Sequence, residues 1–170
     1  IYGISQYGLA KQINVSNYEA EEFLESYFAK FPEIKVYMDS TIKFCRKSGY
    51  VNNIFGIRSH FNGINDKNFN VINFQERAAI NAPIQGSASE VMRLAMIRLH
   101  KKINEEKNLK SKILLQIHDE LIFEVPKKEE KAMVKLIQNE MTSVTQSDYH
   151  SFSTPLTVDV NVGDNWGMLH

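Results

Sequence analysis

The sequence predicts an α+β fold, in which long helices pack against an antiparallel sheet that contains a hairpin. Three observations predict it. Four helices are predicted, over residues 16–31, 32–48, 73–104 and 126–144, and apolar residues recur at helical intervals in the first and the last. Two short apolar runs flank a polar turn at residues 118–120, as in a hairpin of two mostly buried strands. Residues 156–162 alternate strictly between apolar and polar, which is typical of a half-buried strand.

The first part of the chain is predicted to be mainly helical. Ser16 and Glu19 have the spacing of a capping box and begin the helix over 16–31. Pro32 suits the first turn of a second helix, which runs to about Ser48 with Gly49 at its C-terminal end. Residues 50–61 follow as a hairpin or extended loop. The loop-like residues 62–70 predict a boundary between two lobes, 1–70 and 71–170.

The second part combines helices with strands. A long helix is predicted over roughly 73–104, and Pro83 should kink it near Ala79 by removing a backbone donor. Residues 101–112 form a polar, basic connector to the hairpin. Pro126 then starts an amphipathic helix. Its predicted apolar face consists of Met133, Leu136, Ile137, Met141 and Val144.

The composition narrows the class of protein. The chain has 170 residues, 43% of them hydrophobic and 24% charged, which indicates a globular protein. A net charge of zero argues against coating nucleic acid through overall charge, but not against a local basic surface. The single cysteine, Cys45, excludes an intramolecular disulfide and a cysteine-based zinc site. No apolar run approaches the roughly 20 residues of a membrane span. We expect a cytoplasmic protein, and the start at Ile1 leads us to expect a piece of a longer one.

The polar turn between the apolar runs is the first candidate site. His118, Asp119 and Glu120 stand in the stretch LLQIHDELIFEV. A tight turn lifts its side chains to the rim of a sheet, and acidic oxygens gathered there suit Mg²⁺, a hard cation. The alternative is a solvated turn whose acids cap a backbone amide, since Asp favours turns for conformational reasons.

A polar stripe on the long helix is the second candidate site. Arg77, Asn81, Gln85 and Ser89 recur every four residues within an otherwise apolar segment, and small residues lie between them. Arg, Asn and Gln are donors that suit the acceptors of the DNA minor groove, which occur for all base pairs. Such a stripe would recognise the shape of a base pair without reading its sequence. The alternative is a stripe that neighbouring helices or loops satisfy.

Taken together, these stretches resemble the C-terminal part of the polymerase domain of family A DNA polymerases of the bacterial DNA polymerase I type. The resemblance covers essentially the whole chain, in order. It rests on IYG (1–3), YFAKFP (27–32), GYVNNIFGIR (49–58), ERAAINAPIQGSASEVMRLAM (76–96), LLQIHDELIFEV (114–125) and PLTVDVNVGDNW (155–166). The resemblance implies that residues 1–70 are part of the fingers subdomain and that residues 71–170 are the C-terminal part of the palm.

The resemblance also implies roles for single residues. Asp119 would be one of two aspartates that hold two Mg²⁺ ions, with Glu120 as a supporting acid. His118 would contact the primer end, and Tyr2 would lie beside the templating base. Minor-groove contacts would come from Arg77, Asn81 and Gln85. The substrates would be primer–template DNA and dNTPs, in bacterial replication and repair near the nucleoid.

Three departures from the family pattern limit what this chain does alone. The second metal-binding aspartate belongs to an earlier palm motif that is absent here. The fingers Arg and Lys that grip the triphosphate would precede Ile1. Where the family often has Gly-Arg-Arg-Arg, this chain has Gly56-Ile57-Arg58-Ser59. We therefore expect a polymerase as the parent protein and an isolated chain that is inactive, with an incomplete Mg²⁺ site.

Two other functions fit parts of the sequence. A non-catalytic module would bind duplex DNA through the polar stripe alone, and its binding would weaken in an Arg77→Ala variant but not in an Asp119→Ala variant. A metal-dependent phosphohydrolase would use His118 and Asp119 but needs further His or Asp ligands, and the remaining histidines show no ligand spacing.

Overall fold

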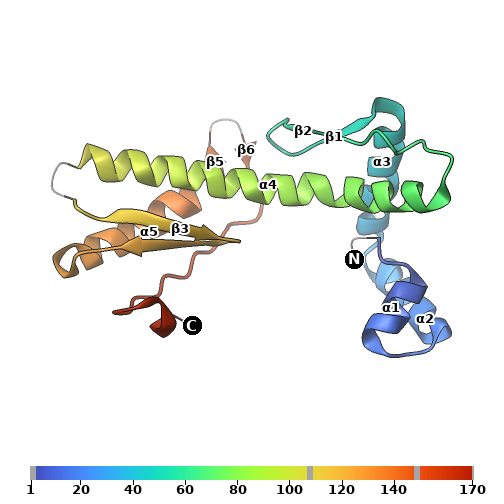
Figure 1. The fold of residues 1–170 in the computed structure, drawn as a ribbon, viewed down its shortest axis with the longest axis horizontal. Coiled ribbons are helices and arrows are strands. Elements are labelled where there is room, and N and C mark those ends of the chain that lie inside the picture. Colours follow the sequence, from blue (N-terminus) through green and yellow to red (C-terminus); the bar gives the residue numbers. More distant parts are fainter. Residues whose placement is uncertain (1–2, 107–108, 148–149, 170) are drawn as a thin grey trace. The chain divides into compact units, whose positions relative to one another are not determined.

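A computed structural model describes residues 3–106, 109–147 and 150–169. The chain divides into two compact units, Ile1–Ser87 and Ala88–His170. Helices dominate, and the strands of the described residues form separate two-stranded antiparallel sheets (Figure 1). The predicted α+β class is therefore confirmed.

Three helices open the first unit: α1 (Gln6–Ile13), α2 (Asn17–Lys30) and α3 (Pro32–Ser48). The predicted capping box is present, because the Glu19 N–H donates to Ser16 Oγ over 3.2 Å and the Ser16 N–H donates to Glu19 Oε2 over 2.9 Å. Gly49 ends α3 with φ 76°, in the left-handed region that favours glycine. Helix α1 had no counterpart in the sequence prediction; Ser5 caps it by accepting from the Gly8 N–H over 3.2 Å.

A hairpin and a small core complete the first unit. Strands β1 (Tyr50–Asn52) and β2 (Arg58–His60) pair antiparallel, which confirms the hairpin expected over 50–61. The core beneath it is formed by Cys45, Val51, Ile64 and Ala79, with Phe61 and Ala82 packed against it. Arg46 Nε donates to Glu76 Oε1 over 2.9 Å and joins α3 to the next helix. Burial raises the pKa of the Cys45 thiol, so this cysteine is a packing residue.

Helix α4 (Phe69–Glu105) is longer than predicted and belongs to both units. It continues through Pro83 without a break, although the missing N–H of Pro83 leaves the Ala79 carbonyl without its helical partner. The predicted helix of roughly 73–104 begins four residues earlier and ends one residue later, and its last turn overlaps the predicted connector. Lys101 Nζ lies 3.8 Å from Glu105 Oε1 at (i, i+4) spacing, a pairing that stabilises a helix end.

The second unit contains the predicted hairpin of β3 (Lys112–Ile117) and β4 (Glu120–Glu124). A short 3₁₀ turn (Lys127–Glu129) then leads into α5 (Glu130–Ser143), the predicted amphipathic helix. The core of this unit is formed by Leu99, Ile103, Met133 and Ile137. Two elements lacked a prediction: the small pair of β5 (Gln146–Ser147) with β6 (His150–Ser151), and a 3₁₀ turn at Trp166–Met168.

The prediction of two mostly buried strands is wrong. Leu114 and Leu115 are 52% and 49% exposed, whereas Ile113, Leu121 and Phe123 pack on the core. Among the described residues, β3 and β4 pair only with each other. One face of this hairpin packs on the core, and no described element covers the other face.

The strand predicted for residues 156–162 is also absent from the described ladders. Val158 and Val160 are half-buried, and Val160 packs on the core of the second unit, whereas Leu156 and Val162 are exposed, so only the middle of the alternation reflects burial on one side. It did not reflect pairing, because the backbone hydrogen bonds of a strand depend on a distant partner that the alternation does not specify.

A buried carboxylate joins the two strands of the hairpin at the end away from its turn. Glu129 is 5% exposed, and its Oε2 accepts from the Lys110 N–H (2.9 Å), the Ser111 N–H (3.0 Å) and the Ser111 hydroxyl (2.8 Å). Burial raises the pKa of this carboxyl and the hydrogen bonds lower it; the hydrogen bonds prevail, so the pKa lies below its ordinary value of 4.5.

Acidification is expected to test this assignment. Because the folded-state pKa of Glu129 is lowered, its contribution to stability is present above the ordinary value of 4.5 and is lost as the pH falls through the folded-state value. In urea unfolding between about pH 6 and about pH 3, Glu129→Gln should lose less stability than the wild type. Glu130→Gln, the same change one residue on, should follow the wild type. Equal pH dependence of Glu129→Gln and wild type would contradict the assignment.

Candidate active site and nucleic-acid interface

The turn of the β3–β4 hairpin consists of two residues, His118 and Asp119. Ile117 pairs with Glu120 and closes it. His118 has φ 51°, a left-handed conformation that costs a residue with a Cβ about 1 kcal/mol or more. Gln116 Nε2 donates to the His118 carbonyl over 3.1 Å and helps to hold this turn. Glycine is the residue most favoured at a position of this kind, and His118 and Asn14 are the non-glycine residues with positive φ among the described residues.

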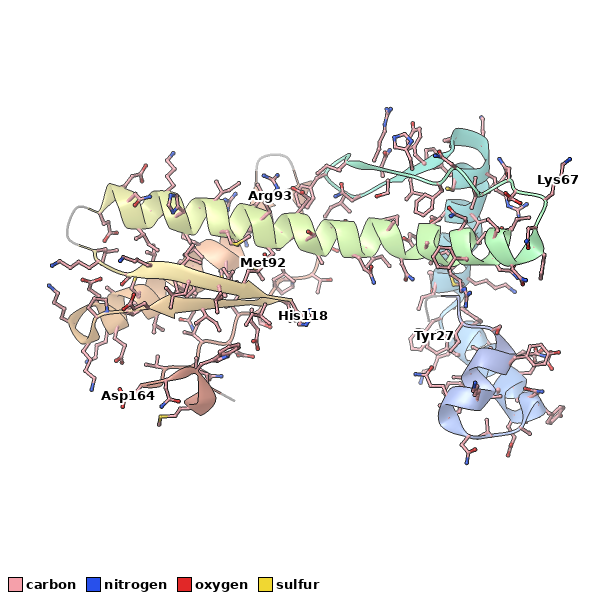
Figure 2. The ribbon with its side chains drawn as sticks, in the orientation of Figure 1. Tyr27, Lys67, Met92, Arg93, His118 and Asp164 are labelled. Carbon is pink, nitrogen blue, oxygen red and sulfur yellow. The ribbon has the colours of Figure 1, made fainter. Side chains whose placement is uncertain are left out.

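The three predicted residues of the turn are brought together at an exposed tip. His118, Asp119 and Glu120 are all exposed, and Figure 2 shows His118 at the end of the hairpin, away from its core. The turn therefore exposes the two acids to water, although apolar runs flank them on both sides. Carboxylate oxygens at such a rim fit a hard divalent cation.

The carboxylates of the turn do not make a complete metal site. Across residues 3–106, 109–147 and 150–169, no group of three His, Cys, Asp or Glu side chains could hold a metal ion. The two acids of the turn therefore fit part of a coordination shell. The same finding gives no support to a phosphohydrolase site, which needs additional ligands around His118 and Asp119.

Three residues of the polar stripe, Arg77, Asn81 and Gln85, lie on the first-unit part of α4. Arg77 and Gln85 are exposed and Asn81 is half-buried. At 1.5 Å per residue, the span from 77 to 85 covers about 12 Å along the helix axis, or roughly three to four base pairs of duplex at 3.4 Å each. Asn81 Oδ1 is buried and has no hydrogen-bond partner among the described residues. A buried acceptor of this kind is costly, so Asn81 is not satisfied by neighbouring elements as the alternative interpretation requires.

Arg77 packs against the start of the chain. The Arg77 Nε donates to the Asn73 carbonyl over 3.3 Å. Gly3 has φ 77°, and a Cβ there would lie 3.0 Å from Arg77 Cγ, so this position favours glycine for both conformation and space. Tyr2, predicted to lie near the templating base, falls outside the described residues.

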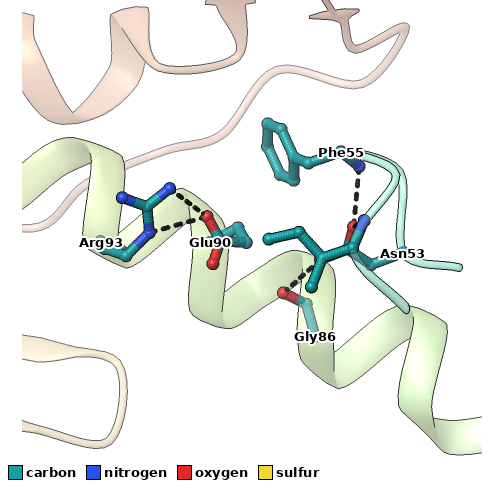
Figure 3. A network of polar contacts seen from close by, with 6 residues as sticks. Asn53, Phe55, Gly86, Glu90 and Arg93 are labelled. Atoms are coloured by element: carbon teal, nitrogen blue, oxygen red, sulfur yellow. Dashed lines mark hydrogen bonds and ion pairs between the residues drawn. The ribbon is translucent and has the colours of Figure 1, made fainter. Parts of the chain in front are cut away.

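Gly86, a small residue beside the polar stripe, is contacted by another part of the chain. Gly86 lies between Gln85 and Ser89 of the stripe, and Asn53 from the β1–β2 hairpin occupies that side of α4 (Figure 3). Asn53 Nδ2 donates to the Gly86 carbonyl over 3.2 Å, and its Oδ1 accepts from the N–H groups of Phe55 (3.0 Å) and Ile57 (2.9 Å). Asn53 thus shapes the hairpin loop and fastens it to α4 beside Gln85.

Removing the Asn53 side chain should destabilise the first unit. Asn53→Ala deletes one donor and one doubly used acceptor, which is expected to lower the free energy of unfolding by about 1–3 kcal/mol. Denaturant unfolding of the full-length protein measures the loss. Asn52→Ala is the matched control, because Asn52 is exposed on the adjacent position of β1. A loss of similar size in both variants would contradict the role of Asn53.

The one arginine retained from the family's arginine run makes an intramolecular contact. The Arg58 guanidinium lies over the Tyr50 ring, 4.5 Å from its centroid, and Tyr50 also meets Phe44 edge-on at 5.7 Å. Arg58 is exposed, so its other face remains accessible to solvent.

Asn53 and Glu129 were missed by the sequence analysis. For Asn53 a signal was present, because Asn three residues before Gly56 is typical of a turn that Asn caps. The contact of Asn53 with Gly86 could not be predicted from the neighbouring sequence, because the two residues are 33 positions apart. Glu129 stands in a charged run after Pro126 and had no feature that distinguished it from exposed neighbours.

Comparison with known proteins assigns the family. Residues 1–168 match the profile of DNA polymerase family A. The chain therefore belongs to DNA polymerase family A. Within the part of the chain that the structure describes, no helix has both the length and the apolar character needed to cross a membrane.

The individual relatives are bacterial. The chain is 43% identical to DNA polymerase I of Caldicellulosiruptor bescii over 166 residues, which cover 98% of this chain and 19% of that protein. It is 42% identical to DNA polymerase I of Geobacillus stearothermophilus, again over 98% of this chain and 18% of that protein. The chain thus spans about a fifth of the length of these curated relatives.

A solved structure matches the fold closely. The POL domain of Pol1 from M. smegmatis, in complex with DNA primer–template and dNTP, superposes with a TM-score of 0.92 at 37% identity. The match covers 99% of this chain and 29% of that chain.

Proposed function

We propose that the full-length protein is a DNA-directed DNA polymerase, which adds dNTPs to the 3′ end of a primer under the direction of a template. The observation that carries the proposal is the two-residue turn that exposes Asp119 and Glu120, within a chain that belongs to DNA polymerase family A. We assign residues 1–70 to the fingers subdomain and residues 71–170 to the C-terminal part of the palm.

In this proposal Asp119 and Glu120 would hold Mg²⁺ together with an aspartate outside this chain. Bound Mg²⁺ neutralises phosphate charge and favours the ionised primer 3′-hydroxyl. Asp119 supplies the principal carboxylate ligand, and Glu120, the first residue of β4, supports it from the strand. His118, held by its left-handed backbone, contacts the primer end and orients the 3′-hydroxyl for in-line attack on the α-phosphorus of the dNTP.

The polar stripe of α4 would read the newly formed duplex. Arg77, Asn81 and Gln85 donate to minor-groove acceptors that all base pairs present, so correct geometry rather than sequence is recognised. Tyr2 would lie beside the templating base. The DNA polymerase I relatives favour a role in bacterial replication and repair, in the cytoplasm with the nucleoid.

A primer-extension assay tests the proposal. The full-length protein should extend a primer on a template in the presence of Mg²⁺ and dNTPs, whereas the isolated 170-residue chain should not. The isolated chain lacks the second aspartate and the triphosphate-binding residues that the proposal requires. Efficient extension by the isolated chain, or none by the full-length protein, would contradict it. Duplex binding without extension by the full-length protein would favour the non-catalytic module instead.

A further inference from the structure

The turn of α4 that carries Gln85 contains three features that weaken a helix. Pro83 has no N–H and cannot donate to the Ala79 carbonyl. Gly86 is unfavourable inside a helix, because its backbone loses more freedom on folding than that of any other residue. Ser87 Oγ donates back to the Pro83 carbonyl over 2.5 Å, a kind of contact that favours bending. The helix nevertheless continues through all three residues.

Burial does not hold this turn. Of the described residues 83–91, none is buried, whereas Ile80 before them and Met92 after them are 3% and 9% exposed. The one large aliphatic side chain next to Gln85, that of Ile84, is 44% exposed. A helix in a protein draws most of its stability from a packed apolar face, so this stretch depends on support of another kind.

The β1–β2 hairpin contacts α4 on both sides of Pro83. On the N-terminal side, Val51 of β1 is 2% exposed and belongs to the same core as Ala79. The Tyr37 hydroxyl of α3 donates to the Ile80 carbonyl over 2.9 Å and adds a second contact there. The first half of α4 is therefore well anchored up to the proline.

On the C-terminal side of the proline, the loop of the hairpin supplies two hydrogen bonds. Asn53 Nδ2 donates to the Gly86 carbonyl over 3.2 Å (Figure 3), and the Ile54 N–H donates to Ser87 Oγ over 3.1 Å. The loop is itself closed, because the Asn53 N–H donates to the Ile57 carbonyl over 3.0 Å. The hairpin therefore spans the residue at which α4 loses a hydrogen bond of its own.

From this geometry we infer that the β1–β2 hairpin stabilises α4 across Pro83 and thereby keeps Gln85 aligned with the rest of the polar stripe. The other two residues, Arg77 and Asn81, precede the proline, so a bend there would move Gln85 relative to them. Asn53 and the hydroxyl that it lies beside are positioning groups and touch no DNA themselves. This inference rests on the proposed function, in which the stripe contacts the minor groove.

Two substitutions remove the support and leave the loop in place. Asn53→Asp keeps an Oδ1 acceptor for the N–H groups of the loop but puts a carboxylate oxygen, in place of a donor, against the Gly86 carbonyl. Ser87→Ala removes the hydroxyl that accepts from the Ile54 N–H. The double variant, Asn53→Asp with Ser87→Ala, removes both contacts. If it does not fold, Ser87→Ala alone carries the test.

Two controls accompany these variants. Ser87→Thr keeps the hydroxyl and should behave like the wild type. Ser40→Ala removes a hydroxyl from an exposed position of α3, where Ser40 Oγ likewise donates to a carbonyl of its own helix, over 2.9 Å. It too should behave like the wild type in both measurements below.

Amide hydrogen exchange in the full-length protein measures the turn directly. In the double variant, the amides of residues 84–88 should exchange about tenfold faster than in the wild type, which is the size of one or two net hydrogen bonds. The amides of residues 95–103, where α4 packs on the core of the second unit, should keep their wild-type rates. Unchanged exchange at residues 84–88 would overturn the inference.

Binding of primer–template separates positioning from simple stabilisation. The double variant should raise the Kd about threefold to tenfold in the wild-type background and by the same factor in an Arg77→Ala background, but not further in a Gln85→Ala background. A purely stabilising contact would lower Tm and leave the Kd unchanged below Tm. No rise in the wild-type background, or an equal rise in the Gln85→Ala background, would overturn the inference.

The single variants distinguish failure of the inference from failure of the proposed function. If Gln85→Ala weakens binding while the double variant binds like the wild type, the inference fails and the proposed function stands. If Arg77→Ala weakens binding but Gln85→Ala does not, the inference fails because Gln85 has no contact to position. If both bind like the wild type, the proposed minor-groove role of the stripe fails and the positioning role fails with it.

Discussion

Asp119→Ala in the full-length protein is expected to lower kcat for dNTP incorporation by about a thousandfold, because the metal stabilisation lost is several kcal/mol and each 1.36 kcal/mol is a factor of ten. The Kd for primer–template should stay within about twofold of wild type, since the proposed DNA contacts lie on α4 and not on the carboxylate. Single-turnover incorporation measures the first quantity, and DNA titration without dNTP measures the second.

The control for Asp119→Ala is Asp159→Asn. Asp159 is exposed in the extended segment after α5 and has no part in the proposed mechanism. It should keep wild-type turnover. An Asp119→Ala variant with near-normal turnover would exclude the role assigned to the turn. A variant that lost DNA binding and turnover together would point instead to a collapse of the hairpin.

Arg77→Ala is expected to raise the Kd for primer–template by about tenfold to a hundredfold, because a hydrogen bond from a charged donor contributes about 1.5–3 kcal/mol. Arg77 is exposed at the N-terminal end of the polar stripe, with its Nε held by the Asn73 carbonyl at 3.3 Å. If it donates to base edges rather than phosphates, the salt dependence of binding should keep the wild-type slope.

Arg93→Ala is the matched control for Arg77→Ala. Arg93 is also an exposed arginine of α4 and follows Ser89 at the same four-residue spacing, but its Nε donates to Glu90 Oε2 over 2.8 Å, so its charge is already paired within the protein (Figure 3). It should bind DNA like the wild type. Equal losses in the two variants would indicate a general charge effect, and a reduced salt slope for Arg77→Ala alone would assign Arg77 to a phosphate.

Local signals in the sequence predicted local structure. Ser16 with Glu19 fixed the start of α2, and Gly49 fixed the end of α3, because capping depends on residues within one turn. The polar turn between two apolar runs likewise predicted the β3–β4 hairpin. The candidate acids and the stripe of α4 could be found because their chemistry is visible in residue type and spacing.

Features that depend on distant partners were not predictable in the same way. The burial of β3 depends on what covers the hairpin. The pairing of residues 156–162 depends on a partner strand. The apolar pattern of the sequence specifies neither of them. The extension of α4 to Glu105 was closer to prediction, since Lys101 and Glu105 have helical spacing.

The most direct test of the central claim is a crystal structure of the full-length protein with primer–template, dNTP and Mn²⁺ in place of Mg²⁺. Anomalous scattering locates Mn²⁺ independently of the protein atoms. A carboxylate oxygen of Asp119 should lie about 2.1 Å from a metal ion, the distance of a magnesium-type oxygen ligand, with the two-residue turn intact. Metal ions bound at the primer end without Asp119 among their ligands would contradict the assignment.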